Sequence, residues 1–155
     1  MSDLDLVLTR RMNVSPARVW RAWTEPKLLE QWFAPKPVIT RNAVIDLRPG
    51  GRFFVLMVMP DGTEYPNEGC VLLVDPGRRL VTTECLTQDF RPAEKPMLPM
   101  TAEIILEPDG AGTLYTARAL HGTAACRDQH AEMGFHDGWG TAATQLEELA
   151  ARLDA

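Results

Sequence analysis

The chain has 155 residues, 45% of them hydrophobic and 24% charged, with a formal net charge of −5. This length favours one domain, 1–155, that buries roughly 70% of the surface of its unfolded chain. The Lys and Arg residues form no cluster and no apolar run approaches the roughly 18 residues that span a bilayer, so neither nucleic acid nor membrane insertion is expected.

The N-terminal region is predicted to form one strand followed by two short helices. Apolar and polar residues alternate over 4–12, which is typical of a strand with one buried face. Ser15 then caps a helix over 16–24, whose first residue is a proline. Pro26 starts a second short helix, and Pro35 ends it.

Six further strands are predicted between the helical segments, at 38–47, 51–59, 68–74, 79–87, 100–107 and 113–121. Pro-Gly-Gly and Pro-Asp-Gly turns and one Asp-Pro-Gly turn separate most of them. Connections this short favour an antiparallel meander, because parallel strands need long crossovers. The proline-rich segment 90–99 cannot pair as a central strand, so we expect a mobile loop there.

Two segments suggest that the sheet encloses something. Residues 53–59 are all apolar, so both faces of that strand are covered by helices, a ligand or another subunit. Within 123–153 we expect one long closing helix that opens in the stretch MGFHDGWG (133–140), which has three glycines and two large aromatic residues. Each interior glycine costs a helix about 1 kcal/mol relative to alanine, which suggests close approach of sheet backbone or a ligand.

Six stretches, in order, carry a resemblance to a known family. They are VSPARVWRAWT (14–24), LLEQWFAP (28–35), DLRPGGRF (46–53), DGTEYPNEG (61–69), RLV (79–81) and GW (138–139). With the order of the elements, they resemble the START/SRPBCC superfamily, or helix-grip fold. Within it, they resemble the branch homologous to the activator of heat-shock-protein-90 ATPase.

The resemblance implies an α+β fold. A curved antiparallel sheet of about six to seven strands would wrap around a long C-terminal helix, with two short helices after the first strand. It also implies an internal cavity for small apolar molecules such as lipids, polyketides or aromatic hormones. The eukaryotic activator works with an additional N-terminal domain for which this chain has no room, so a chaperone partner is not expected.

Four residues are candidates for acid or base catalysis: Glu84, His121, His136 and Asp137. Neighbouring helical positions point about 100° apart, so at most one of His136 and Asp137 can face a cavity directly. The alternative is that these side chains face solvent or make local hydrogen bonds. No nucleophile elbow, phosphate loop or dinucleotide fingerprint is present.

No metal site or cofactor is expected. Cys126, His130 and His136 carry metal-ligating atoms, but no carboxylate or second cysteine has matching spacing. The odd number of cysteines, with Cys70 and Cys85 as the others, and the absence of a CxxC pair indicate reduced thiols. With an acidic N-terminus that lacks a signal peptide, this favours a cytoplasmic protein.

The expected cavity wall is apolar with a few polar groups. Arg52, Glu84 and Tyr115 are candidate polar anchors. Four methionines could add an adaptable lining, namely Met57, Met59, Met97 and Met100. The candidate cavity residues are Trp32, Phe54, Leu56, Val58, Leu72, Leu86, Ile104, Tyr115, Met133 and Trp139.

Three function classes remain open from the sequence. The first is non-covalent binding of a small hydrophobic molecule. The second is a cyclase, dehydratase or hydrolase that acts on such a molecule without a cofactor. The third is a protein-interaction module, either a homodimer or a chaperone-associated stress-response protein.

Overall fold

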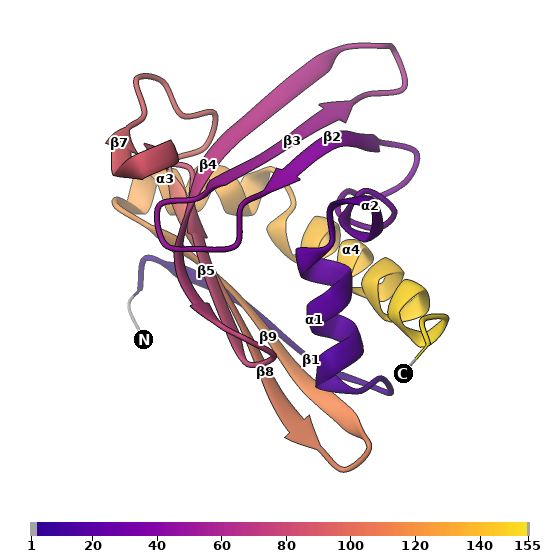
Figure 1. Ribbon diagram of the computed structural model, residues 1–155. Helices are drawn as coiled ribbons and strands as arrows, with labels where there is room; N and C mark the ends of the chain where they lie inside the picture. The colour runs from indigo at the N-terminus through magenta and orange to yellow at the C-terminus, as the bar shows by residue number, and fades with distance from the viewer. Residues whose placement is uncertain (1–2, 155) are drawn as a thin grey trace.

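The computed structural model describes residues 3–154, which form a curved seven-stranded antiparallel sheet and helices packed against it (Figure 1). The strand order is β1-β9-β8-β5-β4-β3-β2. In chain order the elements are β1 (Asp5–Met12), α1 (Pro16–Thr24), α2 (Pro26–Leu29), β2 (Ile39–Ile45), β3 (Arg52–Val58), β4 (Glu64–Asp75), β5 (Arg79–Thr83), β6 (Leu86–Thr87), the 3-10 helix η1 (Gln88–Phe90), β7 (Arg91–Pro92), β8 (Met100–Asp109), β9 (Gly112–His121), α3 (Ala124–Glu132) and α4 (Phe135–Ala151).

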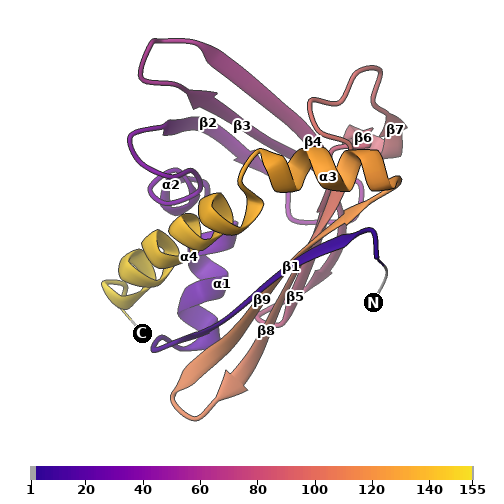
Figure 2. The same cartoon turned by 180° about the vertical axis from the view of Figure 1, so that it is seen from behind.

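The helices α1, α2 and α4 lie on the same side of the sheet (Figures 1 and 2). Helix α4 packs against α1 and β1, and α2 packs against α1 and β2. The predicted α+β architecture, with two short helices after the first strand and a C-terminal helix gripped by the sheet, is therefore confirmed. Within residues 3–154, no helix combines the length and the apolar character needed to cross a membrane.

Helix α1 begins as the sequence predicts. The Ser15 side chain accepts a hydrogen bond from the Arg18 amide, and Pro16 follows at the first position. Its apolar face is buried through Val19, Ala22 and Trp23. These side chains join the solid part of the core, which includes Met12, Leu29, Leu80, Ile104, Leu106 and Leu146.

The long closing helix opens within the predicted stretch 133–140, and a separate helix that was not predicted precedes it. The Thr123 side chain caps α3, which ends at Glu132, and α4 begins only at Phe135. Between them Gly134 has φ 91°, a left-handed conformation that side chains other than glycine rarely adopt. Gly134 therefore ends one helix and redirects the chain into the next.

Two predicted strands also differ from the structure. The strand expected over 79–87 divides, because β5 ends at Thr83 and residues 86–87 pair with 91–92 in a separate two-stranded sheet. Residues 91–92 of the segment 90–99, which was expected to be irregular, therefore form a strand. Strand β4 begins at Glu64, four residues earlier than predicted, and places Pro66 opposite Leu56.

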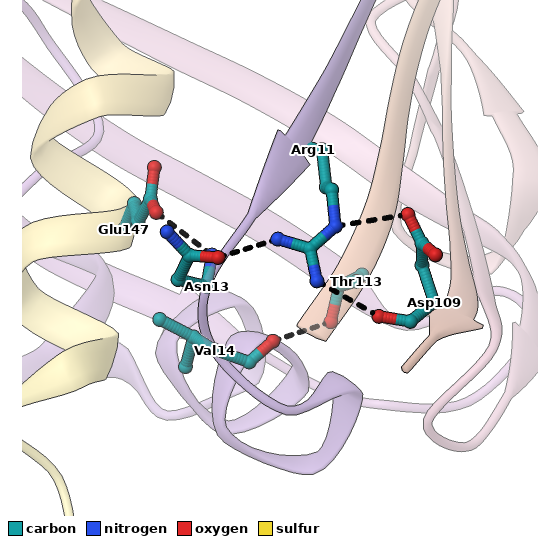
Figure 3. A network of polar contacts seen from close by, with 6 residues as sticks. All are labelled: Arg11, Asn13, Val14, Asp109, Thr113 and Glu147. Atoms are coloured by element: carbon teal, nitrogen blue, oxygen red, sulfur yellow. Dashed lines mark hydrogen bonds and ion pairs between the residues drawn. The ribbon is translucent and has the colours of Figure 1, made fainter. Parts of the chain in front are cut away.

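Polar contacts fix the C-terminal half of α4 to the end of the sheet (Figure 3). The backbone N–H of Asn13 donates to Glu147 Oε2 at 2.8 Å, and the Thr113 hydroxyl donates to the Val14 carbonyl at 2.6 Å. Beside them Arg11 pairs with Asp109 at 3.0 Å. The residues of α4 that line a cavity, from Phe135 to Ala143, belong to the other half of this helix.

Candidate functional site

A cavity of about 400 Å³ lies between the sheet, the segment after α1 and the junction of α3 with α4. Its volume falls in the range of small-molecule sites in proteins, roughly 300–1,000 Å³. The wall is mostly apolar, with aromatic side chains from five parts of the chain: α1, the segment after α2, β3, β9 and α4. The aromatic residues are Trp23, Trp32, Phe33, Phe53, Tyr115, Phe135 and Trp139.

The face of β3 that lines the cavity is not the predicted face but the opposite one. Phe53, Val55 and Met57 line the cavity, whereas the predicted Phe54, Leu56 and Val58 do not. Successive side chains of a strand point to opposite faces, but this strand is apolar on both. The inward face therefore carried no distinguishing pattern in the sequence.

The outer face of β3 is also organised. Arg52 lies over the Phe54 ring at 4.6 Å, and its guanidinium donates two hydrogen bonds to Glu68 at 2.8 and 2.9 Å. This ion pair holds the pKa of Arg52 above its ordinary value, mainly through the side-chain hydrogen bond. Arg52 does not line the cavity and so is not a polar anchor there.

The remaining predicted wall residues divide into two groups. Those that lie on the wall are Trp32, Tyr115, Met133 and Trp139, and those that do not are Leu72, Leu86 and Ile104. Leu72 lies where the register of β4 shifts, Leu86 belongs to the separate two-stranded sheet, and Ile104 is buried in the solid core.

Methionines form an unusual share of the wall. Five of the seven in the sequence line the cavity, at positions 57, 59, 97, 100 and 133. Met97 and Met133 are also 44% and 64% exposed, which indicates that they flank the opening. Because methionine is flexible and polarisable, such a wall can adapt to apolar molecules of different shape.

The glycines of α4 serve different purposes. A Cβ on Gly138 would meet no atom within 4 Å, and Gly138 lines the cavity, so its small size leaves open space there. A Cβ on Gly140 would lie 3.3 Å from Arg10 Nη2. Arg10 donates to the Gly140 carbonyl at 2.8 Å, so the group that approaches this glycine is a side chain and not the sheet backbone or ligand expected from the sequence.

Burial shifts the pKa of three ionisable groups on the wall, Glu84, Tyr115 and His130. Burial raises the pKa of Glu84, just after β5, from 4.5 to about 7. Burial also raises the pKa of the Tyr115 phenol, although a hydrogen bond from Trp23 opposes this. The Tyr115 hydroxyl accepts from Trp23 Nε1 at 3.1 Å and keeps its own hydrogen for donation.

A histidine pair lies at the α3 end of the cavity. His121 Nε2 and His130 Nδ1 are 2.9 Å apart, and both side chains are buried. Burial and the neighbouring His121 lower the pKa of His130 to about 4. His130 lines the cavity and His121 lies behind it.

His136 and Asp137 are exposed and do not line the cavity. Of the four predicted acid–base candidates, only Glu84 lines the cavity, and His121 contacts the wall residue His130. Sequence reasoning missed His130 as a wall residue, since it was considered only as a metal ligand. No group of three or more His, Cys, Asp or Glu side chains in the described part of the chain could hold a metal.

Comparisons with known proteins agree with this architecture. Residues 13–151 match the protein family described as Activator of Hsp90 ATPase homolog 1-like protein. No curated protein matches the sequence. A solved structure from Nitrosomonas europaea is 48% identical with a TM-score of 0.93, covering 98% of this chain and 97% of that one.

Two further solved structures are similar. One, from Mycobacterium smegmatis, is 26% identical with a TM-score of 0.80, over 98% of this chain and 93% of that one. An AHSA1-like protein from Aeromonas hydrophila is 17% identical and has a TM-score of 0.73, over 95% and 92%, so it shares the fold. The chain belongs to the Activator of Hsp90 ATPase homolog 1-like protein family, a branch of the START/SRPBCC superfamily.

Proposed function

We propose that this protein binds a small, largely apolar molecule in the cavity beside α4. The observation that carries the proposal is the chamber of about 400 Å³ lined by aromatic and methionine side chains. Well-packed protein interiors leave few voids larger than a water molecule, so open space on this scale indicates room for a ligand. The exposed Met97 and Met133 give that ligand a flexible entrance.

Gly138 supports the same proposal. It lies inside α4, where alanine would favour the helix by roughly 1 kcal/mol. No neighbouring atom requires the glycine, because its Cβ position is empty. The sequence therefore keeps a less favourable helix residue at a point where any side chain would reduce the volume of the cavity.

The test is a thermal-shift screen of lipids, aromatics and polyketides, with native mass spectrometry of the freshly purified protein to detect a bound small molecule. A ligand at 100 times its dissociation constant adds about 2.7 kcal/mol to the free energy of unfolding. The variant Gly138→Leu, which fills the cavity, should lose the response. Thr141→Leu, at an exposed position of the same helix, should keep it.

Flat melting curves across the whole screen, together with no co-purifying molecule, would contradict a binding role. An equal response in wild type and Gly138→Leu would show that ligands bind elsewhere. Both results can be obtained with the intact chain.

A second candidate function is acid–base chemistry on the bound molecule, and Glu84 is the observation that favours it. Burial brings the pKa of this carboxyl to about 7, near the value at which a general base is effective at neutral pH.

The probe for this chemistry is 5-nitrobenzisoxazole, from which a base removes the ring C–H proton as the N–O bond breaks, giving a coloured nitrophenolate. The reaction should accelerate as the pH rises through about 7 and disappear in Glu84→Gln. A wild-type rate equal to that of buffer would argue against this function.

The cysteines support the proposal that the protein is located in the reducing cytoplasm. All three, Cys70, Cys85 and Cys126, are free thiols. Cytosolic proteins keep their thiols reduced, whereas secreted domains commonly pair them. Cell fractionation followed by thiol labelling tests this, and recovery of the protein in an oxidised extracellular fraction would contradict it.

A further inference from the structure

The histidine pair at the cavity has a fixed arrangement of protons. His121 Nδ1 lies 2.8 Å from the Leu4 carbonyl oxygen. A carbonyl can only accept a hydrogen bond, so Nδ1 of His121 must carry the hydrogen. In the neutral ring the other nitrogen, Nε2, is then an acceptor.

This arrangement determines the tautomer of His130. His121 Nε2 and His130 Nδ1 are 2.9 Å apart, so one of them must donate to the other. Because the His121 nitrogen is the acceptor, His130 Nδ1 carries the hydrogen. The opposite tautomer of His130 would direct two lone pairs at each other. In the neutral pair, Nε2 of His130 is therefore a bare acceptor.

That acceptor is unpaired within the described part of the chain. His130 is only 5% exposed, and no hydrogen bond joins its Nε2 to any residue within 3–154. Its ring packs edge-on against Phe135 and Trp139, with centroids 5.2 and 5.7 Å away. Nε2 lies across the ring from Nδ1 and so points away from His121, and His130 forms part of the cavity wall. Among the described residues, the fully buried side-chain atoms without a partner lie elsewhere, on Arg18, Thr40 and Arg118, so Nε2 of His130 keeps accessible surface at which a ligand can donate a hydrogen bond.

We propose that the cavity selects apolar molecules that bear a hydroxyl group, an alcohol or a phenol, and that this hydroxyl donates its hydrogen bond to Nε2 of His130. The proposal rests on the binding function above and names the polar group of its ligand. His130 keeps its acceptor over the neutral range because burial and the adjacent His121 lower its pKa to about 4. An apolar molecule without a donor would fill the same space and leave Nε2 unpaired.

The binding experiment compares 2-naphthol with 2-methylnaphthalene, which have almost the same shape and differ in the hydroxyl group. Quenching of tryptophan fluorescence reports binding, because Trp23, Trp32 and Trp139 line the cavity. The ratio of the two dissociation constants is measured in wild type and in His130→Phe, which keeps an aromatic ring. We expect the preference for the naphthol to fall by about tenfold in the variant, as for the loss of one hydrogen bond.

The matched control is His136→Phe, an exposed histidine that is not part of the wall. It should keep the wild-type preference. If both probes bind and His130→Phe leaves their ratio unchanged, the hydroxyl proposal is overturned while the binding function stands. If neither probe binds to wild type and the wider screen is also flat, both are overturned.

A measurement on the unaltered protein covers the case in which His130→Phe does not fold. Long-range ¹H–¹⁵N spectra of the imidazole rings at pH 7 distinguish a protonated from an unprotonated ring nitrogen. We expect His130 to carry its hydrogen on Nδ1 and His121 on Nδ1. A hydrogen on Nε2 of neutral His130 would overturn the proposal directly.

Discussion

Trp23 donates its indole hydrogen to the Tyr115 hydroxyl at 3.1 Å, which joins α1 to β9 at the wall of the cavity. Both side chains are buried, at 7% and 3% exposure. In Tyr115→Phe the indole N–H would lose its acceptor, and we expect the free energy of unfolding to fall by about 1–2 kcal/mol. Urea unfolding measures the change.

The chain supplies its own control for this prediction. Tyr65 is the second of only two tyrosines and is 41% exposed. Tyr65→Phe should change the free energy of unfolding by less than about 0.5 kcal/mol. Equal effects of the two substitutions would show that the Trp23 contact contributes nothing to stability.

Glu84 makes stability depend on pH. Its folded-state pKa is raised from 4.5 to about 7, so the folded protein binds this proton more tightly than the unfolded chain. The stabilising contribution is therefore complete below pH 4.5 and is lost as the pH rises through about 7. Relative to wild type, Glu84→Gln should gain up to about 3 kcal/mol between pH 4.5 and pH 8.

Unfolding by urea at pH 4.5, 6 and 8 measures this difference. The pH dependence of wild-type stability alone does not isolate Glu84, because His130 changes the free energy of unfolding in the opposite direction. Its pKa is lowered to about 4, so it reduces stability as the pH falls below about 6.5. Glu25, an exposed carboxylate that pairs with Arg21, provides a control. The difference in unfolding free energy between Glu25→Gln and wild type should not show the pH dependence expected for Glu84→Gln. A constant difference between Glu84→Gln and wild type at all three pH values would refute the assignment.

Gly138 and Gly140 give opposite expectations within one helix. The Cβ of Gly138→Ala would enter open space, so the variant should gain roughly 1 kcal/mol of stability from helix propensity. The Cβ of Gly140→Ala would lie 3.3 Å from Arg10 Nη2, so that variant should gain less or be destabilised. Thermal unfolding of both variants without added ligand measures the difference. The same gain in both would mean that the Arg10 contact does not restrict position 140.

Local backbone chemistry made much of the fold predictable. The Ser15 cap, the prolines after it and the Pro-Asp-Gly turns are short-range signals, and the structure confirms α1 and the antiparallel meander. The separate helix before Gly134 was not predicted, because a glycine next to a helical pattern is compatible both with a helix interior and with a left-handed end. Only the packing of α3 against β1 and β9 distinguishes the two (Figure 2).

The cavity was less predictable than the fold. An apolar chamber was expected, but β3 is apolar on both faces, so alternation could not identify Phe53 and Val55 as the inward residues. His130 was not expected on the wall because its role depends on His121, nine residues earlier and on another element. Contacts of this kind arise from tertiary structure and leave no periodic pattern in a single sequence.

Gln145 of α4 fixes one side of the cavity wall through its side chain. Its amide nitrogen donates to the Trp32 and Ala34 carbonyls at 2.9 and 2.8 Å, and its oxygen accepts from the Lys36 amide at 3.0 Å. Gln145→Ala removes three hydrogen bonds at once and should lower the free energy of unfolding by about 2 kcal/mol. It should also weaken ligand binding, because Trp32 and Ala34 line the cavity.

Hydrogen exchange of the Lys36 amide reports this contact directly, since its acceptor is the Gln145 side chain. We expect faster exchange in Gln145→Ala than in wild type. Gln31→Ala is the control, because the Gln31 side chain donates one exposed hydrogen bond, to the Lys27 carbonyl in the neighbouring helix. It should leave both the Lys36 exchange rate and the free energy of unfolding nearly unchanged. If Lys36 exchanges at the wild-type rate in Gln145→Ala, the segment is held by packing of Trp32 and not by these hydrogen bonds.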